Sequence, residues 1–123
     1  MIGYATLGTN DLEKSSAFYD ELFSDIGVTR VMTDPRMTVW GDERGHGMFS
    51  VIVPYDEEPA TVGNGTMLAI KLKSLDDIKA IHAKAMSMGA SDEGEPSFRA
   101  NNMSFGYVRD PEGHKLCFYC NRQ

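Results

Sequence analysis

The sequence predicts an α+β protein made of two βαβββ modules that form a curved mixed sheet. Three observations support this. The order strand, helix and three strands occurs twice, each helix follows a short strand and a capping side chain, and the turn Asp42-Glu-Arg-Gly-His46 returns as Asp110-Pro-Glu-Gly-His114. We therefore predict a single duplicated domain over residues 1–123, with module one at about 1–56 and module two at about 64–121.

Module one begins with a predicted strand at Ile2–Thr9, after which Asn10 or Asp11 caps a helix. Near-helical spacing of apolar side chains continues to Ile26, and Gly27 ends the helix. Turn residues then separate three short runs of strand-forming residues. These predicted strands are Val28–Thr33, Met37–Gly41 and Met48–Val53.

Module two repeats this order after a turn-rich stretch, Pro54–Gly65. A strand at Thr66–Lys73 precedes Ser74, which is the predicted cap of a helix closed by Gly89. His82 lies on the inward side of this helix, where we expect it to be an edge-of-core residue rather than a metal ligand. The remaining predicted strands are Ala90–Phe98, Met103–Arg109 and Lys115–Cys120.

Charge and composition exclude several partners. A formal net charge of -6 with scattered basic residues offers no surface for nucleic acid or an anionic membrane. No apolar run reaches the length of a membrane span, and the start of the chain lacks a leader pattern, so we expect a cytoplasmic protein. Cys117 and Cys120 lie three apart in a predicted strand, where they point to opposite faces and cannot share a metal.

Strand alternation predicts which side chains face away from the helices. In the strand from Thr66, the apolar set that begins at Leu68 suits helix packing, which leaves Met67 on the opposite side. The repeat places Tyr4 there as well. We predict an apolar small-molecule pocket between the modules, lined by Tyr4, Thr6, Phe49, Val51, Met67, Ala69, Cys117 and Tyr119, with Trp40 or Tyr107 near by according to the parity of the third strands and Arg30, Arg99, Asn101 and Asn102 as polar contacts at its mouth.

Two segments resemble the vicinal-oxygen-chelate superfamily of glyoxalases, bleomycin-resistance proteins and dioxygenases. They are Gly3–Lys14, with Phe18 and Tyr19 in the following helix, and Val108–Leu116, which contains the fairly specific Asp-Pro-x-Gly turn. The resemblance covers nearly the whole chain. It implies the fold that the internal repeat predicts.

Metal-dependent members of that superfamily hold a divalent ion with His, Gln or Glu from the first and last strands of each module. By the resemblance, these positions correspond here to Tyr4, Phe49, Met67 and Cys117. A phenol, a phenyl ring, a thioether and a thiol do not make a divalent site, because such ions prefer oxygen and nitrogen donors. We therefore expect no metal and no cofactor.

Three functional hypotheses remain open at this point. The first is a metal-free protein that binds a small organic molecule, similar to the antibiotic-binding branch of the superfamily. The second is a lyase, isomerase or dioxygenase, for example one like lactoylglutathione lyase, with a non-standard site. The third is an oligomerising module without a ligand. Dimerisation is compatible with the first two as well as the third, and we expect a homodimer.

Overall fold

The computed structural model describes residues 1–99 and 101–121. The chain divides into two compact units, Met1–Val62 and Gly63–Gln123. The division falls inside the turn-rich stretch between the two predicted modules. Each unit carries one helix and one four-stranded sheet, and each is described by itself below.

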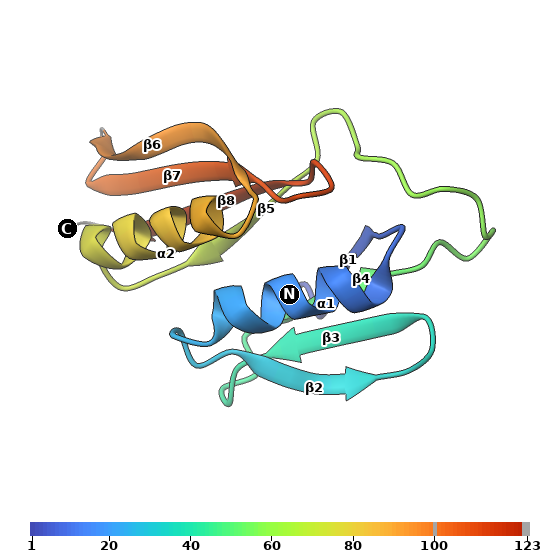
Figure 1. Cartoon of the computed structure of the whole chain (residues 1–123). Coiled ribbons are helices and arrows are strands. Elements are labelled where there is room, and N and C mark those ends of the chain that lie inside the picture. Colours follow the sequence, from blue (N-terminus) through green and yellow to red (C-terminus); the bar gives the residue numbers. More distant parts are fainter. Residues whose placement is uncertain (100, 122–123) are drawn as a thin grey trace. The chain divides into compact units, whose positions relative to one another are not determined.

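The first unit is a βαβββ module whose elements follow the predicted order (Figure 1). Its sheet has the strand order β1-β4-β3-β2, in which β1 and β4 are parallel and the other neighbours are antiparallel. The elements are β1 (Tyr4–Gly8), α1 (Leu12–Phe23), β2 (Thr29–Thr33), β3 (Met37–Gly41) and β4 (Met48–Ile52).

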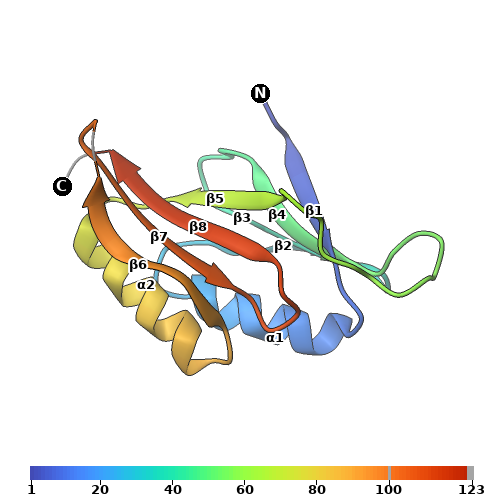
Figure 2. The ribbon, with the colours of Figure 1, turned by 90° about the horizontal axis from the view of Figure 1, so that it is seen from above.

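The second unit repeats that topology, with the strand order β5-β8-β7-β6 and a parallel β5–β8 pair (Figure 2). The elements are β5 (Met67–Lys71), α2 (Leu75–Ser87), β6 (Ser91–Arg99), β7 (Met103–Arg109) and β8 (Lys115–Asn121). The same strand order in both units confirms the predicted α+β fold and its duplication.

Both helices start at the predicted caps. The Asp11 carboxylate accepts a hydrogen bond from the Lys14 backbone amide at 3.0 Å, and the Ser74 hydroxyl accepts one from the Asp77 amide at 3.1 Å. Each bond satisfies an amide that the first helical turn leaves without an intrahelical acceptor. The first helix ends at Phe23, earlier than the apolar spacing predicts, and turn residues lead to Gly27 at φ 75.

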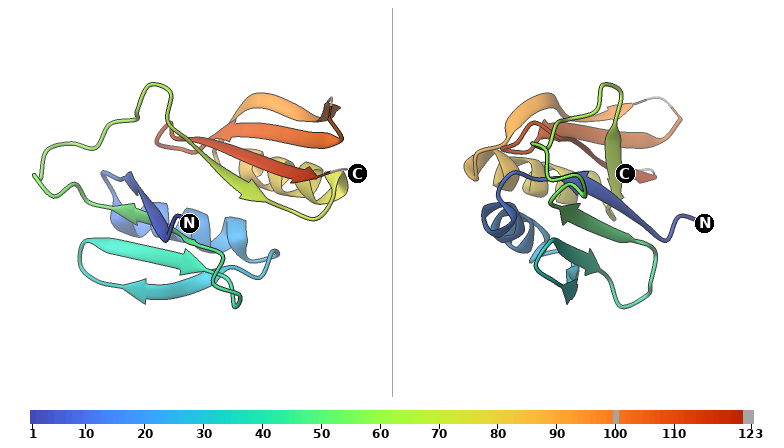
Figure 3. Two further views of the ribbon diagram at one scale, coloured as in Figure 1. Left: turned by 180° about the vertical axis from the view of Figure 1, so that it is seen from behind. Right: turned by 90° about the vertical axis from the view of Figure 1, so that its right-hand side faces the viewer.

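One face of each sheet packs against the helix of its own unit (Figures 1 and 3). In the first unit, Tyr19 and Phe23 of α1 form an aromatic cluster with Trp40 and Phe49, in which the Tyr19 and Phe49 ring centroids are 4.6 Å apart. In the second unit, the buried apolar side chains of α2 and of β7 and β8 form the core. They are Ile78, Ile81, Ala85, Val108, Leu116 and Phe118.

Within the described part of the chain, neither helix has the length and apolar character that crossing a bilayer requires.

Candidate ligand-binding face

We call the side of each sheet that lies opposite its own helix the open face. In the second unit, the strand register defines this face. Cys117 is paired with Ala69 on one side and with Tyr107 on the other, and Tyr119 is paired with Lys71. Cross-strand partners point to the same side of a sheet. Met67, Tyr107, Cys117 and Tyr119 therefore share the open face, as the sequence predicts, whereas Leu116 and Phe118 point to the helix.

Three aromatic rings form a row on this open face. Phe105 lies between Tyr107 and Tyr119, with centroid distances of 6.1 Å and 6.3 Å and interplanar angles of 6° and 22°. The rings are therefore nearly parallel and each keeps a partly exposed surface. Phe105 was absent from the predicted lining, although its position two residues before Tyr107 on the same strand places it on the same side.

Cationic side chains surround this row. The Arg99 guanidinium carbon lies 6.0 Å from the centre of the Tyr107 ring, and the Lys115 amine lies 5.3 Å from the same ring. Arg109, whose strand partner is Lys115, forms an ion pair with Glu93 at 3.4 Å and donates a hydrogen bond to the Gly113 carbonyl. Arg99, which the sequence predicts as a polar ligand contact, thus lies beside the aromatic row.

Tyr107 in this row and the neighbouring Cys117 are both neutral at neutral pH. Burial raises the pKa of the Tyr107 phenol, and the neighbouring Cys117 raises it further, against a smaller lowering by Arg99. Burial also raises the pKa of the Cys117 thiol, which outweighs the opposing effects of Tyr107, Lys115 and Arg99. Neither group is therefore a nucleophile or a base near pH 7, because each would first have to ionise in a desolvated position.

In the first unit, the predicted lining is wrong at three positions. Phe49 packs against Tyr19 of α1, and its strand partner Trp40 belongs to the same aromatic cluster. Val51 is on that side too and is 1% exposed. These three side chains point to the helix. They form the core of the first unit and do not lie on its open face.

The reason for this error is one additional residue in the turn before β4. The register pairs Tyr4 with Met48 in the first unit and Met67 with Lys115 in the second, so Met48 is the structural counterpart of Lys115. Gly47, at φ 103, is the extra residue. Because side chains alternate along a strand, a shift of one residue moves each of them to the other face.

Tyr4 and Thr6 do lie on the open face of the first unit, as predicted. Tyr4 is 57% exposed, and Thr6 is paired with Ser50. Ser50 therefore replaces Phe49 as the counterpart of Cys117. Its hydroxyl donates a hydrogen bond to the Ala5 carbonyl at 2.8 Å.

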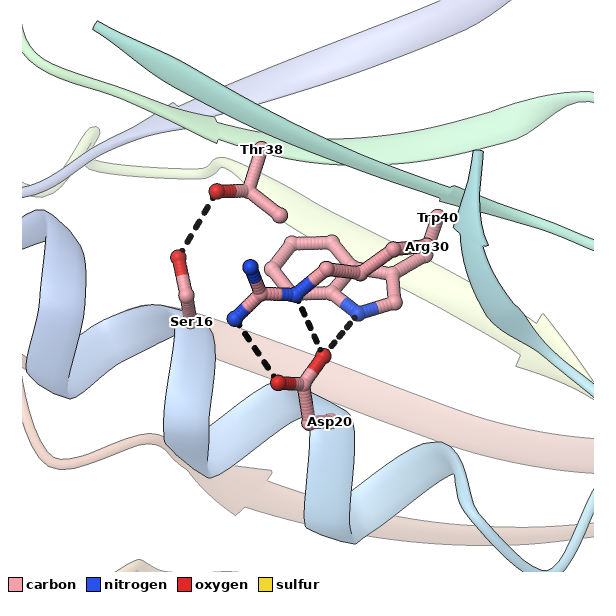
Figure 4. A network of polar contacts seen from close by, with 5 residues as sticks. All are labelled: Ser16, Asp20, Arg30, Thr38 and Trp40. Atoms are coloured by element: carbon pink, nitrogen blue, oxygen red, sulfur yellow. Dashed lines mark hydrogen bonds and ion pairs between the residues drawn. The ribbon is translucent and has the colours of Figure 1, made fainter. Parts of the chain in front are cut away.

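Arg30, predicted as a polar contact at the mouth, is instead bound to α1 (Figure 4). Its guanidinium donates two hydrogen bonds to the Asp20 carboxylate, at 2.9 Å and 2.8 Å, and the Trp40 indole donates a third at 2.9 Å. The pKa of Asp20 is lowered, chiefly by the hydrogen bond from Arg30 and also by the one from Trp40. These groups tie β2 and β3 to α1, and the predicted ligand contact is wrong.

The two asparagines predicted at the mouth, Asn101 and Asn102, form the turn between β6 and β7. Both have positive φ, 66 and 58. Asparagine tolerates this left-handed conformation better than most residues do. The backbone geometry of the turn therefore explains why asparagine occupies both positions.

The corrected first-strand and last-strand positions do not fit a divalent metal ion. They carry Tyr4, Ser50, Met67 and Cys117, and none of these is an imidazole or a carboxylate. Because the pKa of the Cys117 thiol is raised, this side chain is not a ready thiolate ligand either. The donors needed for the metal chemistry of the superfamily are missing from these positions.

A group of potential metal ligands occurs elsewhere, on α2 and β6. One ligand atom from each of His82, Asp92 and Glu95 lies within 4.8 Å of the others. The His82 ring is buried and lies 3.0 Å from Asp92, whose pKa is lowered by the Gly94 amide and then by His82. His82 is therefore a buried residue with a polar partner, in line with its predicted position at the edge of the core.

The duplicated βαβββ topology defines a class of proteins built from paired modules, and comparison with known proteins identifies the family. The model of the glyoxalase/bleomycin resistance protein/dioxygenase superfamily matches residues 1–118. The chain belongs to this superfamily. No match was found among curated proteins.

Solved structures give the same result. A glyoxalase/bleomycin resistance protein from Albidiferax ferrireducens T118 is 31% identical with a TM-score of 0.89, over 98% of both chains. A glyoxalase-related enzyme from Fulvimarina pelagi is 23% identical with a TM-score of 0.77, over 98% of this chain and 88% of the other. A lactoylglutathione lyase from Agrobacterium tumefaciens is 18% identical with a TM-score of 0.70, over 98% and 92%. The latter two show likeness of fold alone.

Proposed function

We propose that this protein binds a small organic molecule, without a metal ion, on the open face of its second unit. The observation that carries the proposal is the row of nearly parallel rings, Tyr107, Phe105 and Tyr119, beside the Cys117 thiol. The partly exposed rings offer contact area to a ligand, and phenol hydroxyls can orient the ligand by hydrogen bonds. Such a face suits recognition of a flat molecule.

Binding is favoured over catalysis because of the protonation states on this face. The raised pKa values of Tyr107 and Cys117 leave both groups neutral, so neither supplies a base tuned near neutrality. The positions that hold a Lewis acid in metal-dependent relatives carry side chains that do not bind one. The alternative of an enzyme like lactoylglutathione lyase or a dioxygenase remains a prediction. Turnover of methylglyoxal with glutathione would establish the lyase over the binding function, and O₂ consumption with an added substrate would do so for the dioxygenase.

A thermal-shift screen against a library of aromatic and aliphatic small molecules tests the proposal. We expect at least one compound to raise the melting temperature, since a ligand that binds only the folded state stabilises it. The Tyr119→Leu variant should lose that shift, whereas Tyr55→Leu, which removes a ring that is 89% exposed in the first unit, should keep it. Absence of any hit, or equal shifts in both variants, would contradict the proposal.

We also propose a cytoplasmic homodimer. Cys117 is a buried free thiol, which agrees with a reducing compartment. The edge strand β2 exposes Val31 and Met32, at 53% and 43%, as apolar surface that a second copy would cover. Light scattering after gel filtration tests the dimer, and a monomeric mass across a concentration series would exclude it.

A further inference from the structure

We infer that the ligand of the open face is a planar aromatic anion whose charged group lies near Lys115 and Arg99. This inference rests on the proposed function and adds the chemical class of the ligand. It is carried by two arrangements on the same surface: the aromatic row, and the cations placed over one end of that row.

Both cations converge on a single ring. Lys115 lies 5.3 Å and Arg99 6.0 Å from the centre of Tyr107, although they come from strands on opposite sides of β7. Among the residues that the structure describes, no acidic side chain forms an ion pair with either of them. Their charges are therefore available to a ligand that lies along the row next to Tyr107.

The sign of charge on this face is opposite to that of the chain as a whole. The register places four cationic residues on it, Lys71, Arg99, Arg109 and Lys115, and Glu93 is paired with Arg109. The complete chain has a formal net charge of -6. A local excess of positive charge on an acidic protein attracts an anion to that place and disfavours cationic ligands there.

The aromatic row favours a flat molecule over a bulky one. The interplanar angles of 6° and 22° make the three rings nearly parallel, so that a flat ligand can lie along the partly exposed side of the whole row. A ring that carries an anionic substituent satisfies both features, with its plane against the row and its charge toward Lys115. A neutral ring would use only the first feature, and a saturated anion only the second.

The probes are 2-naphthoate, its neutral analogue 2-naphthamide and the saturated decahydro-2-naphthoate, measured by calorimetry and by backbone amide shifts in NMR. We expect 2-naphthoate to bind most tightly, and its affinity to fall when salt is raised, because screening weakens exposed charge pairs. Shift changes should centre on β7 and β8. Lys115→Gln should weaken 2-naphthoate about five- to tenfold, in the range expected for the loss of one charged contact, and leave 2-naphthamide within about twofold.

The matched control is Lys79→Gln, which removes the same charge from an exposed position on α2, away from the open face. It should leave the affinity for 2-naphthoate unchanged. Equal binding of 2-naphthoate and 2-naphthamide, or equal effects of the two lysine variants, would overturn the anionic class while the binding function stands. If the thermal-shift screen and all three probes give no binding, the proposed function itself fails.

Discussion

The Trp40 indole nitrogen donates a hydrogen bond of 2.9 Å to the carboxylate of Asp20, on the opposite side of the core from the open face. The same carboxylate accepts two bonds from Arg30. We expect Asp20→Asn to lower the free energy of unfolding by about 1 kcal/mol, because a partly exposed ion pair contributes little more than that. Urea denaturation measures the change. Glu43→Gln, in an exposed turn, is the control and should leave the free energy of unfolding unchanged. Equal effects of the two substitutions would show that the Asp20 contacts do not stabilise the fold.

The same carboxylate predicts a dependence of stability on pH. The pKa of Asp20 in the folded protein is lowered from 3.8, so its contribution is complete above that value and is lost as pH falls through the lower, folded pKa. The stability difference between wild type and Asp20→Asn should therefore shrink progressively as the pH falls below about 5. Melting temperatures of both proteins across this range would show it. A constant difference would mean that the carboxylate charge does not act on stability.

With the corrected register of β4, substitutions of two adjacent residues should differ in how much stability they cost. Phe49 packs in the aromatic cluster, whereas Met48 is 40% exposed. Phe49→Ala should cost about 2–3 kcal/mol, at the lower end of the range for phenylalanine because the ring is only partly buried. Met48→Ala should cost about 1 kcal/mol or less. Equilibrium denaturation of both variants measures which one loses more stability. A larger loss for Met48→Ala would support the register that was predicted from the sequence.

Substitutions at two glycines in the turn before β4 distinguish the cost of backbone strain from the cost of a steric contact. Gly45 has φ 69, inside the left-handed region, and a Cβ atom there would meet nothing within 4 Å. Gly47 has φ 103, and its Cβ would lie 3.2 Å from the Ile2 carbonyl oxygen. We expect Gly45→Ala to cost about 1 kcal/mol and Gly47→Ala to cost about 2 kcal/mol or more. Similar costs in thermal melts would show that the contact with Ile2 is relieved easily.

Metal removal should leave the stability of the protein unchanged. The first-strand and last-strand positions of both units lack metal-binding side chains, so EDTA should not lower the melting temperature and added Mn²⁺ should not raise it. If Zn²⁺ stabilises the protein, His82→Gln tells where it binds, because His82, Asp92 and Glu95 are the described residues close enough to share an ion. A zinc effect that survives His82→Gln would place the metal outside this group.

Most of the fold could be predicted from the sequence because its signals are local. The caps Asp11 and Ser74 mark the helix starts, and the two Asp-to-His turns mark the last strands. Alternation within β5 gave the correct face for Met67. These features depend on neighbours a few residues away, which a sequence displays directly.

The face on which each candidate residue lies was predicted correctly in the second unit and only in part in the first. Cys117 and Tyr119 follow a turn without an insertion, so counting from Asp110 reaches the right face. In the first unit the same count reaches Phe49, because nothing in the local sequence shows that Gly47 is extra. The pairing of Tyr4 with Met48 reveals it, and that pairing joins residues far apart in the chain. The ion pair of Arg30 with Asp20 is likewise a tertiary contact.

Gly47 also bears on how the two halves of the chain diverged after duplication. Any alignment of one half on the other needs a single-residue gap before the last strand, and a comparison without that gap equates positions that face the helix with positions on the open face. Conversely, deleting Gly47 would exchange the faces of Phe49 and Ser50, placing an aromatic ring on the open face and a hydroxyl against the helix. The length of this turn therefore decides which side chains of β4 face the helix, although most of the turn is exposed to solvent.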